Sequence, residues 1–225
     1  MKNLLAALAG VAVAAAFGAS AHATTFIFKG GAPYDTPTGN IAFDCGTVGV
    51  DFCSADDAAG LSYSKDGITV TAVAYTAGGA TQLIQDISPE NSGLGALSEN
   101  NNIDDQTQTN SGEWIVFTFN QSVTLSNIEF NAGNDTDCST PGDEGPCGNF
   151  DLFINNVFFG NLTAVDLLAG PFIGSIFKFV PTTAGAGFAV AQFTVTPEVP
   201  VPAALPLLLS GLAGLGFAAR RKRPA

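Results

Sequence analysis

The stretch Glu113-Trp-Ile-Val-Phe-Thr-Phe119, then Asn120-Gln121-Ser122, then Val123-Thr-Leu-Ser-Asn-Ile-Glu-Phe130, decides the fold class. Its strongly apolar residues recur at every second position, which puts Ile115, Phe117 and Phe119 on one face of an extended strand. Trp114 falls on the opposite face, together with Val116. The polar triplet between the two segments has the composition of a turn, so we expect the segments to pair as a β-hairpin.

The same period of two recurs along the chain. Gly78-Gly79 separates residues 68–75 from residues 81–87, and Asn155-Asn156 separates residues 150–154 from residues 157–159. Both dipeptides suit a tight turn, and the asparagine pair suits one that needs positive φ. Residues 175–180 and 188–195 are predicted as a closing pair of strands. Short strands without a long helix predict a single all-β domain over residues 24–196, a jelly-roll-like β-sandwich.

Residues 1–23 have the features of a signal peptide. Lys2 precedes an apolar stretch from Leu4 to Phe17, and Ala21-His22-Ala23 supplies the small residues that signal peptidase accepts. We therefore expect the chain to be exported and Thr24 to be the first mature residue.

The C-terminal residues 197–225 combine a proline-rich segment, an apolar run and a basic end. The motif Val199-Pro200-Val201-Pro202-Ala203 comes first. Residues 203–219 are uncharged, and Arg220, Arg221, Lys222 and Arg223 follow. As a helix, those 17 residues would span about 25 Å, the short end of a transmembrane segment, with the basic cluster on the cytoplasmic side.

This order of motif, helix and arginine cluster resembles the PEP-CTERM sorting signal of Gram-negative bacteria. The motif is similar to the Val-Pro-Leu-Pro-Ala subtype, departing from it at Val201, and Glu198 precedes the Val-Pro pair. The resemblance implies recognition by an exosortase, which cuts near the motif, removes the helix and passes the protein to the cell surface or extracellular matrix. The inner-membrane anchor is then transient. An ordinary single-span anchor is the alternative.

Charge and residue content exclude several functions. The segment 24–197 keeps Lys29, Lys65 and Lys178 against 19 acidic residues, a net charge of 3 − 19 = −16. Such a surface repels nucleic acid. The only histidine, His22, is lost with the signal peptide, which removes Ser-His-Asp and Cys-His catalysis. Glycoside hydrolysis by two carboxylates stays open, and Glu129 and Asp151 are the acids within predicted strands that would serve it.

The four cysteines form two local pairs in the sequence, Cys45 with Cys53 and Cys138 with Cys147. In an exported chain we expect disulfides, and we favour the two local pairings among the three connectivities possible. Wide spacing and an oxidising compartment argue against zinc.

Oxygen ligands gather around the second cysteine pair. Asp135, Asp137, Asp143, Glu144 and Asp151 could supply part of a calcium site, although the spacing does not match an EF-hand and a solvated acidic loop is the alternative.

No sequence feature indicates an enzyme directly, so the leading hypothesis is a non-enzymatic surface or matrix protein. It would associate with exopolysaccharide through its β domain. Sugars stack on aromatic rings, and Trp114 is the single tryptophan, although packing against the protein is the more common role of such a residue. Signal peptidase and exosortase would be its partners during processing. The alternatives are a small carboxylate-dependent glycan hydrolase and a purely structural matrix component.

Overall fold

The computed structural model describes residues 21–31, 33–38, 52–55, 59–87, 93–97, 109–132, 136–138, 147–165, 167–184 and 187–198. These residues form strands and turns and contain no α-helix, which confirms the all-β class. None of the described residues form a helix long and apolar enough for a membrane span. Residues 1–20 of the expected signal peptide, and the whole motif, apolar run and basic cluster from 199 onward, lie outside the described residues.

The strands lie within one compact unit, His22–Glu198. Their bounds are β1 Thr24–Ile27, β2 Phe52–Ala55, β3 Leu61–Lys65, β4 Ile68–Thr76, β5 Gly79–Asp86, β6 Leu94–Leu97, β7 Glu113–Ala132, β8 Thr136–Asp137, β9 Asn149–Ile154, β10 Val157–Thr163, β11 Phe172–Pro181 and β12 Ala189–Pro197. Because this unit holds every described strand and the apolar core, it has what a domain needs to fold by itself.

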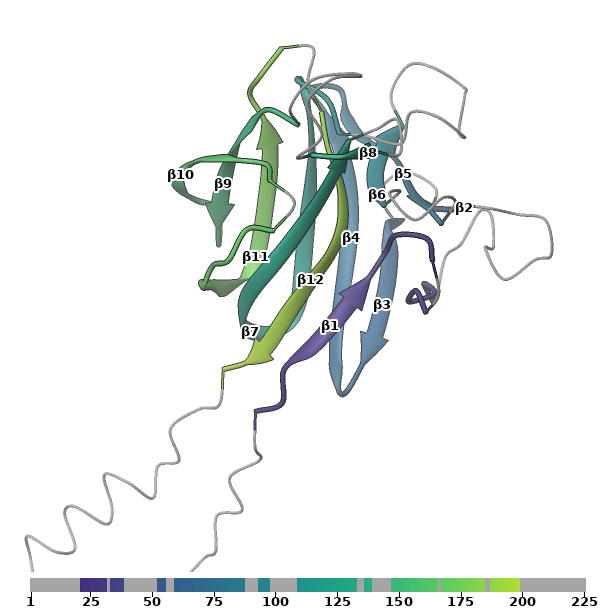
Figure 1. Cartoon of the computed structure of the whole chain (residues 1–225), viewed down its shortest axis with the longest axis vertical. Coiled ribbons are helices and arrows are strands. Elements are labelled where there is room, and N and C mark those ends of the chain that lie inside the picture. The colour runs from purple at the N-terminus through teal and green to yellow at the C-terminus, as the bar shows by residue number, and fades with distance from the viewer. Residues whose placement is uncertain are drawn as a thin grey trace, which may run out of the picture. The chain divides into compact units, whose positions relative to one another are not determined.

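Hydrogen bonding joins the strands into one sheet in the order β1-β12-β6-β5-β4-β7-β11-β9-β10, and β12 also pairs with β7. That extra pairing closes a ring of β12, β6, β5, β4 and β7, while β11, β9 and β10 extend from its side (Figure 1). The chain is therefore a small closed barrel with additional strands. The jelly-roll sandwich is not confirmed, because the described strands do not separate into two independent sheets.

The predicted hairpin between residues 113–119 and 123–130 is wrong. Both edges of Phe117 are already occupied, by Ala72 of β4 and by Phe177 of β11. Both edges of Leu125 are also occupied, by Phe172 of β11 and Val195 of β12. The two segments are therefore successive halves of one long strand, β7, and the polar triplet between them is the place where its partner changes from β4 to β12.

β7 bends sharply between its halves. Phe193 of β12 lies beside Asn127 and Ile128, since the flanking residues Gln192 and Thr194 pair with Glu129 and Ser126. A straight strand would separate Phe117 from Ile128 by about 36 Å, at about 3.3 Å for each of 11 residues. The rings of Phe117 and Phe193 are instead 5.2 Å apart, so the halves of β7 face each other across the core.

A β-bulge keeps the second half of β7 facing inward. Leu125 and Ile128 are both fully buried although they are three residues apart, a spacing that would place them on opposite faces of a regular strand. The register with β12 shifts at this point, and Asn127 takes a φ of 48°. One extra residue, an asparagine that tolerates the left-handed conformation, restores the inward direction.

Local turn chemistry fixes three hairpins. The β4–β5 hairpin is confirmed, but it turns at Ala77-Gly78, one residue before the predicted Gly78-Gly79, because Thr76 pairs with Gly79. The β9–β10 hairpin is confirmed at the predicted turn, with Val157 paired to Ile154 and with both Asn155 and Asn156 at positive φ. The third, β3–β4, turns at Asp66-Gly67, again with positive φ at both residues.

The predicted closing pair exists as β11 and β12, but these strands pair with β7 on its two edges and not with each other. The end of the domain also differs from the prediction, which placed it at residue 196. Thr196 and Pro197 belong to β12, and Glu198 donates its backbone N–H to Ser122 and accepts a hydrogen bond from Thr124 Oγ1. The β domain therefore includes Glu198, immediately before the predicted sorting motif.

Aromatic rings fill the core. Phe193 alone contacts four other phenylalanines, with ring centroids 5.1 to 5.9 Å apart: Phe26, Phe28, Phe117 and Phe119. Tyr63 is also buried, and its hydroxyl donates to Gln85 Oε1 at 3.0 Å. Burial, with a smaller contribution from the charge of Asp35, raises the pKa of Tyr63 well above 10.0. The phenol therefore stays neutral and works as a hydrogen-bond donor in the core.

Candidate functional site

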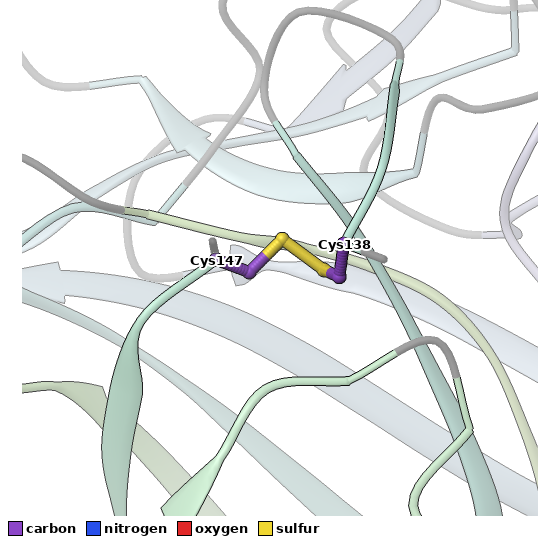
Figure 2. The surroundings of a disulfide bond; sticks show 2 residues. All are labelled: Cys138 and Cys147. Carbon is purple, nitrogen blue, oxygen red and sulfur yellow. A yellow bond between two sulfur atoms is a disulfide. The ribbon is translucent and has the colours of Figure 1, made fainter. Parts of the chain in front are cut away.

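The disulfide between Cys138 and Cys147 is confirmed, with a Cα–Cα distance of 5.2 Å (Figure 2). It links the turn after β8 to the residue two positions before β9. Cys147 is buried and joins the apolar core. Cys45 and the side chain of Cys53 lie outside the described residues, so their pairing stays a prediction.

The residues predicted to hold calcium are mostly outside the described part of the chain. Asp135, Asp143 and Glu144 are not described, and Asp137 is described only as a backbone position of β8. Asp151 lies on β9, where its Oδ1 accepts a hydrogen bond from Asn161 Nδ2 at 2.8 Å. The described residues contain no group of three or more potential metal ligands.

The two acids suggested for hydrolysis point away from each other. Glu129 is followed by Phe130, and Asp151 is preceded by Phe150; both rings are fully buried and their centroids are 5.2 Å apart in the core. Neighbouring residues of a strand point to opposite faces, so each carboxylate projects outward from its own wall, with the core between them. Glu129 is ion-paired with Lys29. These two residues do not form the paired-carboxylate arrangement of a glycosidase.

The outer surface of β4, β7, β11, β9 and β10 gathers side chains of a different kind. Register aligns them in two rows across these strands. In the first row Tyr75 pairs with Trp114, Val180 pairs with Asp151, and Asp151 pairs with Asn161. Phe179 pairs with Ile115, which places Val180 beside Trp114 and joins the two parts of the row.

In the second row Val116 pairs with Lys178, Lys178 with Phe153, and Phe153 with Phe158. We call the set Tyr75, Trp114, Phe153, Phe158 and Lys178 the outer aromatic face. Trp114 lies on the surface opposite to Ile115 and Phe117, as the alternation predicts, because those two side chains are buried and it is only partly so.

Contacts between the side chains hold this face together. Tyr75 and Trp114 stack with 6.0 Å between centroids and 10° between planes, and Phe153 meets Phe158 edge to face at 5.6 Å. Lys178 bridges the two ring pairs: its Nζ lies 4.3 Å from the centroid of Trp114 and 5.3 Å from that of Phe153. These cation–π contacts order the lysine between the rings.

Polar groups border the rings. Asn161 Nδ2 donates to Asp151 Oδ1 at 2.8 Å and to Thr182 Oγ1 at 3.2 Å. At the margin, Phe158 is 55% exposed. An ordered apolar surface beside amide, hydroxyl and carboxylate groups matches the chemistry of a sugar, whose C–H faces pack on rings while its hydroxyls take hydrogen bonds.

Sequence reasoning identified Trp114 and Asp151 separately, and it missed Tyr75, Phe153, Phe158 and Lys178 as parts of the same surface. Alternation within residues 150–154 carried a usable signal, because burial of Phe150 and Leu152 sends Asp151 and Phe153 outward. The assembly of the face depends on strand pairings that the local pattern does not encode.

No family model matches this chain, and no curated protein and no solved structure is significantly similar to it.

Proposed function

We propose that this chain is an exported, non-enzymatic protein whose β domain binds exopolysaccharide through the outer aromatic face. The observation that carries the proposal is the joining of Tyr75, Trp114, Phe153 and Phe158 on one outer surface, beside the polar pair Asp151 and Asn161. A contiguous apolar patch on the outer surface of a protein often marks a binding site, and Phe158 is the exposed member of this one.

Export and sorting complete the proposal. β1 begins at Thr24, the first residue after the expected signal-peptidase cut, and the compact unit that holds every described strand ends at Glu198, just before the motif 199–203. These limits agree with processing on both sides of a finished domain. Exosortase cleavage in or near that motif would release the domain from residues 203–219, the expected transient inner-membrane helix, to the cell surface or matrix.

Binding is tested with the purified Thr24–Glu198 chain and the extracellular polysaccharide of the producing organism. The wild-type chain should sediment with the polysaccharide, and Phe158→Ala should reduce the bound fraction several-fold. Leu167→Ala is the matched control, because Leu167 is 57% exposed and adjoins Leu168, which bridges to Ile128 in the second half of β7. If the wild-type chain does not sediment, with or without calcium, binding is refuted and a purely structural role is favoured.

Sorting is tested in cells with the Pro200→Ala, Pro202→Ala double variant. The proposal predicts that this variant stays membrane-bound and uncut. Processing and surface release at the wild-type level would refute recognition by an exosortase and leave an ordinary anchor as the explanation.

A further inference from the structure

Lys178 differs from the other lysines of the β domain. The sequence from 24 to 198 contains only Lys29, Lys65 and Lys178. Lys29 is ion-paired with Glu129, and Lys65 with Asp35 at 2.9 Å. Lys178 contacts two aromatic rings, and no carboxylate of the described ranges lies within ion-pair distance of it.

The position of Lys178 suits it for an external anion. It stands in the middle of the outer aromatic face, with Trp114 and Phe153 on its two sides, and it is half-buried. Ring faces attract the ammonium but take none of its N–H groups in a strong hydrogen bond, so its three donors stay available. The nearest acid by register is Asp151, two residues from Phe153, and its Oδ1 accepts a hydrogen bond from Asn161.

The negative charge of the whole domain does not cancel this local attraction. At physiological ionic strength the Debye length is about 8 Å, so carboxylates farther than that from a bound anion are largely screened. A direct ion pair with a half-buried ammonium is screened much less, and a hydrogen bond to a charged group is stronger than one between neutral groups.

From this arrangement we infer that the glycan bound by the outer aromatic face is acidic, with carboxylate-bearing sugar units. Lys178 pairs with the carboxylate while neighbouring rings pack against the sugar. The inference rests on the proposed carbohydrate binding and adds the charge class of the ligand. It also explains why one of the three lysines of this domain lies at the centre of an aromatic surface.

The test uses two polymers with the same sugar backbone: polygalacturonate, which carries carboxylates, and its methyl ester, in which each carboxylate is replaced by an uncharged ester. The wild-type Thr24–Glu198 chain should bind the acidic polymer about tenfold or more tightly than the ester at 0.15 M salt. Equal binding of both polymers, or tighter binding of the ester, overturns the inference while leaving carbohydrate binding intact. Failure to bind these polymers and the organism's own polysaccharide overturns the proposed function itself.

Variants then assign the preference to a residue. Lys178→Met should remove most of the preference for the acidic polymer, and Lys178→Arg, which keeps the charge, should retain it. Lys29→Met removes the same charge at the ion pair with Glu129, outside the outer aromatic face, and should leave the preference unchanged. The melting temperature of each variant shows whether it is folded. A folded Lys178→Met that keeps the full preference, or a Lys29→Met that loses it equally, contradicts the assignment.

Discussion

Replacing Phe117 and Phe193 with leucine, singly and together, tests the bend of β7. The two rings are fully buried and 5.2 Å apart, although Phe193 lies beside residues ten and eleven positions beyond Phe117 in that strand. Each single change should lower the free energy of unfolding by about 1 to 2 kcal/mol. An edge-to-face aromatic pair is worth about 0.5 to 1.5 kcal/mol beyond its area, so the double variant should lose less than the sum by about that amount.

Urea unfolding followed by the fluorescence of Trp114, the single tryptophan, provides the measurement. Phe193→Leu with Phe150→Leu is the control cycle. The rings that contact Phe150 are Phe130, Phe179 and Phe188, and none of them contacts Phe193. That pair should be additive to within about 0.5 kcal/mol. If Phe117 and Phe193 were as additive as the control, the halves of β7 would not face each other and the bend would be refuted.

Two further predictions concern stability. Changing Cys138 and Cys147 together to serine should cost about 2 to 3 kcal/mol, because a sequence separation of 9 closes a loop of about ten residues; an unchanged urea midpoint would contradict this. Burial raises the pKa of folded Tyr63 above its unfolded value, so its contribution is complete below about pH 10 and is lost as the pH rises further. The free energy of unfolding, measured from pH 9 to 11, should therefore fall more steeply for wild type than for Tyr63→Phe. The variant is the control for lysine titration, which occurs in the same pH range and is common to both proteins. Tyr63→Phe should itself cost about 1 to 3 kcal/mol at neutral pH, since Gln85 Oε1 loses a buried donor.

The parts of the fold that sequence could predict are those set by neighbouring residues. The Asn155-Asn156 turn determines the β9–β10 hairpin because both residues accept positive φ. Asp66-Gly67 carries the same kind of signal for β3–β4, so that hairpin was predictable from sequence although it was not among those predicted.

Pairings between distant segments were not predictable in this way. Asn120-Gln121-Ser122 resembles a hairpin turn, but β4 and β12 occupy the edges that a hairpin would have used. β4 and β12 lie far from β7 in the sequence, so the residues within and next to β7 do not show that these strands will pair with it. The outer aromatic face has the same origin, because Lys178 meets Trp114 and Phe153 only after β11 has paired on both of its edges.

The most direct test of carbohydrate binding is the affinity of Trp114→Ala for the organism's extracellular polysaccharide, compared with wild type. Trp114 contacts both Tyr75 and Lys178, so its removal dismantles the centre of the outer aromatic face. We predict a loss of affinity of at least about tenfold, the effect of about 1.4 kcal/mol, in a variant that still unfolds cooperatively. Unchanged affinity in the folded variant would contradict the assignment of binding to this face.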